Sequence, residues 1–231
     1  ESTKGFDSDK QSRTTANDMY IIAKHALENE TIKKISSKYG KTMPKTNKSD
    51  VRYLYNTNPL LNDYSYYYYP GAVGLKTGTT SKAGCCLSAT AERDGLHLVA
   101  VVMGSDNSTD RFETAKAMLD WGFSNYESIT PEIDKKLITD VLVVKGEEDK
   151  VTPAIPETEP ILVKKGRAGD IKQTVTLSLA VNAPVEKGQT LGKVEFSLDG
   201  EKLAEYNLLS SVNVDTLKLP LAFKRLLMRL V

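Results

Sequence analysis

The chain has 231 residues, with 31 basic and 30 acidic side chains and a formal net charge of +1. This length is enough for about two domains with cores of their own, and the balanced charge excludes the basic footprint of a nucleic-acid-binding protein. No apolar run in the sequence reaches the roughly 18 residues that a membrane-spanning helix requires.

The N-terminal part of the chain has the pattern of helices followed by a polar segment. Residues 1–14 read as loop, and Thr15 with Asp18 predicts a capped helix start. A set of apolar residues then falls on one helical face: Met19, Ile22, Ala23, Ala26 and Leu27. A second short helix is predicted at residues 31–37. Residues 38–70 are polar and read as irregular, and the tyrosine-rich stretch 64–69 is interpreted as a loop or edge strand.

Three strands are predicted next, at residues 72–79, 85–92 and 96–103. The turn at residues 93–95 favours a hairpin, and Gly95 is expected to adopt a positive φ. Such short links make the three strands antiparallel neighbours. A helix follows, with Asp110 predicted as its N-cap and Gly122 as its stop.

The pattern changes near residue 128 to a series of short strands. A strand is predicted at 137–144, and apolar and polar residues alternate through Val175, Leu177 and Leu179 and again around Phe196. Three prolines within residues 153–160 predict a crossover connection between strands. Several short strands separated by turns are typical of a small all-β sandwich.

The C-terminal residues 219–231 predict an amphipathic helix. One side is apolar: Leu219, Phe223, Leu226, Leu227, Leu230 and Val231. The other side is cationic: Lys224, Arg225 and Arg229. The helix is too short to cross a bilayer, so it either lies on a membrane surface or docks on the β domain, and the cationic arc favours the membrane surface. The predicted organisation is therefore a mixed domain at 1–127, a β-rich domain at 128–218 and this helix at 219–231.

Lys76, Thr77 and Gly78 are the residues that most suggest chemistry. A glycine on an edge strand admits the backbone of a ligand, and a lysine beside it supplies a fixed cation. With the hydroxyl and N–H groups of Thr79 and Thr80, these residues suit an anionic peptide end. Taken alone, the triplet occurs by chance in many proteins, and the default interpretation is a solvated lysine in a turn.

Other reactive residue types form no recognisable site. His25 and His97 are not expected to form a catalytic pair, and no spacing suggests a metal ligand set or a phosphate-binding loop. Cys85 and Cys86 are adjacent and bridge poorly, so we expect no structural disulfide and interpret them as inert packing.

Several short motifs occur in one order along the chain. They are Asn56-x-Asn58-x-Leu60-Leu61, Gly74-Leu75-Lys76-Thr77-Gly78-x-Thr80-x-x-Ala83-Gly84, Val102-Met103-Gly104 and Trp121-Gly122-Phe123. Together they resemble the D-alanyl-D-alanine carboxypeptidases, the low-molecular-mass penicillin-binding proteins. The resemblance implies an α/β (α+β) β-lactamase/transpeptidase-like catalytic domain, incomplete here, followed by the β-sandwich and the amphipathic helix.

The resemblance also implies roles for single residues. Lys76 would contribute positive potential near the nucleophile, and the backbone N–H of Thr79 would donate to the oxyanion. Thr77, Gly78 and Arg111 would bind the substrate, with the Thr77 hydroxyl and the Arg111 guanidinium on its terminal carboxylate. Some family members have histidine where this chain has Thr79, which leaves the backbone donor unchanged.

The implied activity is removal of the terminal D-alanine from peptidoglycan stem peptides through a serine acyl-enzyme, at the extracytoplasmic face of a bacterial membrane. β-Lactams would acylate the same serine, and no cofactor, metal or nucleic acid is implied. The nucleophile motif Ser-x-x-Lys and the Ser-x-Asn element are expected upstream of residue 1, so these 231 residues alone should be inactive. Two alternatives remain: a serine β-lactamase-like hydrolase, and a non-catalytic, membrane-associated wall-binding module.

Overall fold

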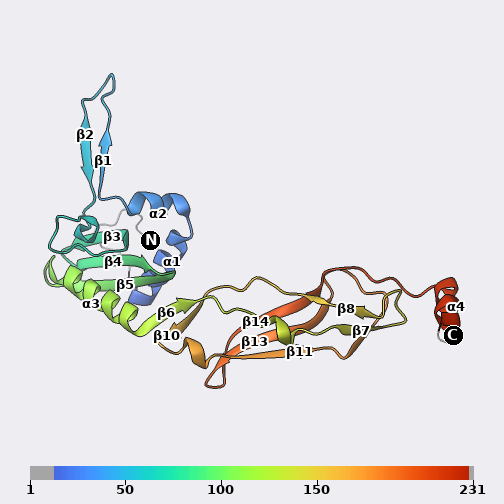
Figure 1. Ribbon diagram of the computed structural model, residues 1–231. Helices are drawn as coiled ribbons and strands as arrows, with labels where there is room; N and C mark the ends of the chain where they lie inside the picture. Colours follow the sequence, from blue (N-terminus) through green and yellow to red (C-terminus); the bar gives the residue numbers. More distant parts are fainter. Residues whose placement is uncertain (1–12, 229–231) are drawn as a thin grey trace. The chain divides into compact units, whose positions relative to one another are not determined.

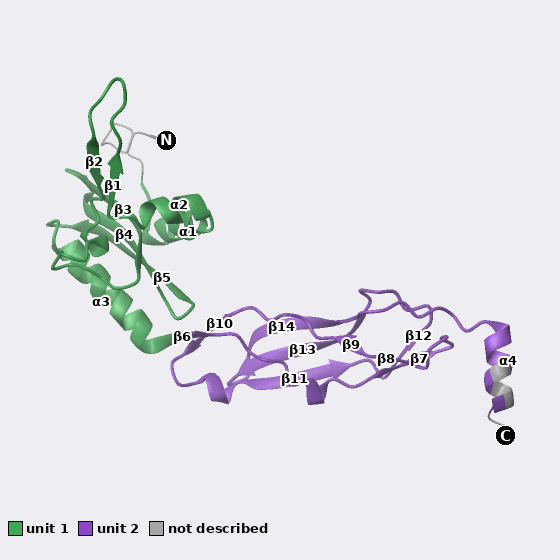
Figure 2. Ribbon diagram, turned by 45° about the horizontal axis from the view of Figure 1, so that its top comes forward, with its two compact units in different colours: residues 1–127 green, residues 128–231 purple. Residues whose placement is uncertain are grey.

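The computed structural model describes residues 13–228, and Figure 1 shows their helices and strands. The chain forms two compact units, residues 1–127 and residues 128–231 (Figure 2). Unit 1 contains α1 (Ala16–Leu27), α2 (Glu30–Ser36), β1 (Gly40–Met43), β2 (Arg52–Tyr55), the 3₁₀ turn η1 (Pro59–Leu61), β3 (Ala72–Thr80), β4 (Gly84–Arg93), β5 (Leu96–Ser105) and α3 (Asp110–Asn125).

The centre of unit 1 is an antiparallel three-stranded sheet in the order β3-β4-β5. This confirms the three predicted strands, and the hairpin turn has Asp94 and Gly95 at φ 49° and 75°. The core gathers Leu87, Ala89 and Ala91 of β4 against Phe112, Ala115 and Leu119 of α3. Because β3 is an edge strand, its outer side is not paired within the sheet.

Helix α1 begins with the predicted capping box. The Asp18 N–H donates to Thr15 Oγ1 at 3.1 Å, and the Thr15 N–H donates to Asp18 Oδ2 at 2.8 Å. Ala23 is buried on the predicted face, whereas Ile22 is 58% exposed. The apolar face of α1 is therefore only partly covered by the described part of the chain.

The predicted ends of α3 are wrong. Asp110 is the first helical residue, and the cap before it is supplied by Asn107, whose Oδ1 accepts from the N–H groups of Thr109 and Asp110. Gly122 lies inside the helix, which continues to Asn125. A Cβ at Gly122 would meet Leu98 Cδ1 at 2.5 Å, so this glycine lets α3 lie close to β5, and a larger residue there would make the Leu98 side chain shift.

Residues 38–70 were predicted as irregular, but they contain the antiparallel hairpin β1–β2. Figure 1 shows this hairpin projecting from unit 1 away from the β3–β4–β5 sheet. All four residues of β2 are exposed. A ribbon exposed on both faces needs no apolar alternation, and so the usual strand signal is missing from its sequence.

Unit 2 is rich in β-structure. Strand β6 (Tyr126–Ile129) spans the boundary between the units. The other strands of unit 2 are β7 (Val141–Val144), β8 (Lys150–Val151), β9 (Pro153–Ala154), β10 (Ile161–Lys164), β11 (Lys172–Leu177), β12 (Ala180–Asn182), β13 (Thr190–Leu198) and β14 (Glu201–Ser210), with 3₁₀ turns η2 (Lys135–Leu137) and η3 (Ala168–Asp170). They form sheets β11-β13-β14-β9, β12-β7-β8 and β10-β6. Two buried clusters fill the unit, one around Val141 and Leu191 and the other around Phe196 and Leu208.

Two local predictions in unit 2 need correction. The strand predicted at 137–144 is shorter, because residues before Val141 form the turn η2 and a connecting loop. Leu179 continues the alternation in sequence, but β11 ends at Leu177 and Leu179 is 92% exposed. The alternating sequence pattern thus extends two residues beyond the end of the strand.

Helix α4 (Leu219–Met228) forms where the amphipathic helix was predicted. Arg225 of this helix contacts the segment after β7: its guanidinium donates to Asp149 Oδ1 at 2.8 Å, to the Gly146 carbonyl at 3.3 Å and to the Glu147 carbonyl. Leu219 and Phe223 are 86% and 64% exposed. Arg229, Leu230, Val231 and the side chains of Lys224, Leu226 and Leu227 lie outside those described. No helix among residues 13–228 has both the length and the apolar character to span a membrane.

Candidate active site

The predicted triplet lies in the middle of the edge strand β3. Lys76 and Gly78 are exposed, and Thr77 between them is only 9% exposed, as expected because side chains alternate between the two faces of a strand. A Cβ placed on Gly78 would meet no atom within 4 Å. The strand therefore offers open space beside Gly78, where the backbone of an extended ligand can approach.

The Lys76 ammonium folds back on its own strand. Its Nζ donates to the carbonyl oxygen of Thr77 at 2.6 Å. This contact holds a positive charge beside the exposed edge of β3, next to Gly78.

Arg111, in the first turn of α3, reaches across to β3. Its Nη1 donates to the Gly78 carbonyl and to Thr79 Oγ1, both at 3.0 Å, and to the Cys86 carbonyl at 3.3 Å. The residue is 8% exposed, and its Nε is buried with no hydrogen-bond partner in the described part of the chain. The structure thus brings Arg111 together with Gly78 and Thr79, 32 or more positions earlier in sequence.

Thr57 was not predicted to belong to this region. Its Oγ1 lies 2.6 Å from Thr77 Oγ1, a short hydrogen bond between the loop after β2 and β3. Thr57 is the middle residue of the motif Asn56-x-Asn58, but nothing in the sequence indicated that its side chain would contact β3.

The cysteines and histidines considered in the sequence have contacts of their own. Cys85 pairs in register with Thr79, whose hydroxyl donates to Cys85 Sγ at 3.8 Å, and both cysteines are free thiols. His97 contacts Glu92 at 3.5 Å, and His25 contacts Glu28 at 2.8 Å. Residues 13–228 hold no cluster of three or more side chains of the metal-binding types His, Cys, Asp and Glu.

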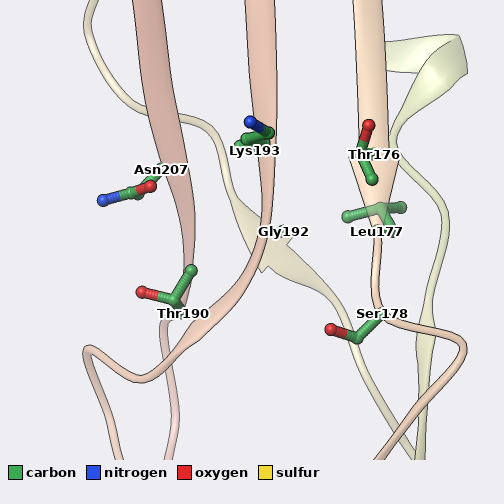
Figure 3. Close-up of a pocket in the computed structure, with 7 residues that line it drawn as sticks. All are labelled: Thr176, Leu177, Ser178, Thr190, Gly192, Lys193 and Asn207. Carbon is green, nitrogen blue, oxygen red and sulfur yellow. The ribbon is translucent and has the colours of Figure 1, made fainter.

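A separate hollow of about 270 Å³ lies in unit 2 (Figure 3). Its lining comes from β11, β13, β14 and the start of the loop after β11: Thr176, Leu177, Ser178, Thr190, Gly192, Lys193 and Asn207. The register of β13 against β14 shifts between Thr190 and Gly192 beside it. None of the candidate site residues lines this hollow, so we assign it no part in the chemistry.

Two family models match separate segments that together cover most of the chain. Residues 1–107 match the model described as D-alanyl-D-alanine carboxypeptidase, and residues 126–216 match that of the penicillin-binding protein 5 C-terminal domain. The chain belongs to the D-alanyl-D-alanine carboxypeptidase family. The first model includes the whole of β3, and the second covers unit 2 up to residue 216, before α4.

Individual family members agree with this membership. The chain is 35% identical to D-alanyl-D-alanine carboxypeptidase DacF of Bacillus subtilis over 83% of its own length, and 32% identical to DacA of Haemophilus influenzae over 87%. The crystal structure of penicillin binding protein 5 from Haemophilus influenzae matches 91% of this chain and 59% of that one, with 31% identity and a TM-score of 0.67. This match confirms the predicted fold class. The chain spans 48% and 49% of the two curated relatives.

Proposed function

We propose that the protein is a serine-type D-Ala-D-Ala carboxypeptidase, which removes the terminal D-alanine from peptidoglycan stem peptides. The observation that carries this proposal is the contact of Arg111 with Gly78 and Thr79 at the open edge of β3. In a member of this family, a guanidinium beside an exposed glycine and two threonines suits a peptide that ends in a carboxylate.

The reaction requires a serine nucleophile, and the 231 residues contain no Ser-x-x-Lys sequence. In the proposed reaction, a serine supplied from outside these residues attacks the carbonyl carbon of the penultimate D-alanine. The peptide C–N bond breaks, and the terminal D-alanine leaves with the proton that the serine released. Water then hydrolyses the ester and restores the serine.

Each candidate residue has a part in this reaction. The Thr79 N–H donates to the developing oxyanion, where loss of one donor typically costs about 10²–10³ in rate. Lys76 contributes positive potential, and Gly78 lets the peptide lie against β3. Thr77 and Arg111 bind the terminal carboxylate, the group that distinguishes a chain end from an internal peptide bond.

β-Lactams are proposed to acylate the same serine. A labelled penicillin and mass spectrometry test this: the full-length gene product should gain one adduct, and the 231-residue chain alone should gain none. The matched control replaces the serine of the Ser-x-x-Lys motif by alanine. A stable adduct on the 231-residue chain would contradict the proposed location of the nucleophile.

Measuring the released products beside the adduct separates the two alternatives. A β-lactamase would release hydrolysed penicillin faster than it releases D-alanine from a stem peptide. A wall-binding module without catalysis would form no adduct and release no D-alanine even as the full-length product.

We further propose that the protein lies on the extracytoplasmic face of the membrane, held peripherally by α4. The exposed Leu219 and Phe223 support an apolar contact with lipid. Lys224, Arg225 and Arg229 add about 1 kcal/mol for each cation near an anionic surface, an attraction that salt screens. Arg225 joins that surface only if it leaves Asp149, since the two are paired at 2.8 Å.

Liposome co-sedimentation tests the membrane contact. The intact chain should pellet with anionic vesicles at low salt, and a chain ending at Leu219 should stay in solution. Phe223→Asp should weaken binding, whereas Leu162→Asp, the same change at a site that is also exposed (55%) on β10, should not. If the intact and shortened chains sediment alike, α4 is a structural part of unit 2 and not an anchor.

A further inference from the structure

Side-chain hydrogen bonds of Asn56 and Asn58 hold the turn that contains Thr57. Asn56 Nδ2 donates to the carbonyls of Ser36 and Lys38, each at 3.2 Å, and Asn56 Oδ1 accepts from the Asn58 N–H at 3.0 Å. The fully buried Asn58 donates from Nδ2 to the Gly74 carbonyl of β3 at 3.2 Å. Two asparagines therefore fix the backbone on both sides of Thr57 against α2 and β3.

The hydroxyl of Thr57 has one hydrogen-bond partner among residues 13–228, and that partner is Thr77 Oγ1 at 2.6 Å. The same is true of the Thr77 hydroxyl. Each hydroxyl carries a single proton, so only one of the two donates to the other. The remaining proton is free for a third group.

A carboxylate decides which proton remains free, because an ionised carboxylate only accepts hydrogen bonds. With such a group in front of Thr77, the stable arrangement has Thr57 donating to Thr77 and Thr77 donating to the carboxylate. Hydrogen bonds linked in a row polarise and strengthen one another.

We propose that Thr57 is a positioning residue: its hydroxyl donates to Thr77 Oγ1 and so directs the Thr77 proton toward the terminal carboxylate of the substrate. This inference rests on the proposed carboxypeptidase function. Thr57 sets the preference for a free chain end and takes no part in breaking the peptide bond.

The test uses the full-length protein with Thr57→Val, which keeps the shape and removes the hydroxyl, and Thr57→Ser, which keeps the hydroxyl. Two peptides are compared, one ending in D-Ala-D-Ala with a free carboxylate and one with that carboxylate amidated. Thr57→Val should lower kcat/KM for the free carboxylate about 2- to 12-fold, the loss expected for one hydrogen bond. It should leave kcat/KM for the amide unchanged, and Thr57→Ser should restore the discrimination.

Thr42→Val is the matched control, because Thr42 is an exposed threonine of β1, in the hairpin that precedes the turn of Thr57. It should alter neither substrate. Thr57 is itself exposed, so its replacement should not unfold the protein, and the melting temperature of each variant checks this. Thr57→Ala provides a second test should Thr57→Val prove unstable.

An equal loss on both peptides would mean that Thr57 acts only on structure, and would overturn the inference. So would a Thr57→Ser variant that behaves like Thr57→Val, or a Thr57→Val variant with unchanged discrimination. If the unsubstituted full-length protein releases no D-alanine, the proposed function fails and the inference fails with it. If that protein is active but Thr57→Val discriminates normally, only the inference fails.

Discussion

Arg111 has both a structural role, in joining α3 to the sheet, and a proposed role in binding the substrate. Its guanidinium ties the start of α3 to β3 and β4, and it stacks with its central carbon 4.7 Å from the centroid of the Phe112 ring. Burial of a charged group is unfavourable unless it is well paired, yet its Nε has no partner in residues 13–228. A lysine cannot reproduce this arrangement, because it has no planar fork of donors.

Arg111→Ala in the full-length protein is predicted to lower kcat/KM for peptides with a free carboxylate by about 10- to 150-fold, the loss of a charge-assisted contact. The amidated peptide should lose less. Kinetics on both peptides measure the effect, and urea unfolding reports the accompanying loss of stability. An equal loss on the amidated peptide would mean that Arg111 does not recognise the carboxylate.

At the scale of elements, an ion pair joins α2 to the sheet. Lys33 Nζ lies 2.8 Å from Glu92 Oε2 on β4, and His97 on β5 lies 3.5 Å from the same carboxylate. The hydrogen bond from Lys33 lowers the pKa of Glu92 below its usual 4.5, with smaller help from the charges of His97 and Lys33. A carboxyl whose pKa is lowered by folding stabilises the folded state above its unfolded pKa and loses that effect as the pH falls through its folded pKa.

Glu92→Gln is therefore predicted to reduce the free energy of unfolding at pH 7 by about 0.2–1 kcal/mol, the range of partly exposed ion pairs. The difference from the unsubstituted chain should shrink below pH 4.5, the usual pKa of this group, and vanish once both states are protonated. Urea unfolding at pH 7 and pH 3 measures it. Asp63→Asn, at an exposed carboxylate of unit 1, is the control. A difference that does not shrink between pH 7 and pH 3 would refute the assignment to the ion pair.

At the scale of the whole molecule, each unit contains its own core. The buried cluster of unit 1 extends from Leu60 to Leu119, and the two clusters of unit 2 lie between Ile133 and Val214. No buried cluster of the described residues draws on both units. We infer that unit 2 needs neither unit 1 nor α4 to fold.

A fragment of residues 126–218 should therefore unfold in one cooperative thermal transition and give well-dispersed amide resonances. Phe196→Ala in that fragment removes a side chain that is 2% exposed and should cost about 3–5 kcal/mol. Its melting temperature should fall steeply. A fragment that is unfolded without unit 1 would show that the two units depend on each other for stability.

Local patterns in the sequence were enough to predict the β3–β4–β5 meander, the capped start of α1 and the position of α4, because short links and side-chain periodicity act over a few residues. The same patterns missed the β1–β2 hairpin, since both of its faces are exposed on β2 and no core selects its side chains. They also placed the N-cap of α3 at Asp110, although Asn107 supplies that hydrogen bond.

Part of the candidate site could be predicted from the sequence, and part depends on the tertiary structure. Lys76, Thr77, Gly78 and Thr79 are consecutive, so the sequence alone showed that they share a strand and alternate in direction. The contacts of Thr57 with Thr77 and of Arg111 with Gly78 join positions 20 and 33 residues apart. Nothing local specifies such pairs, because they arise when the packing of α3 and the asparagine-held turn bring distant segments to one edge of the sheet.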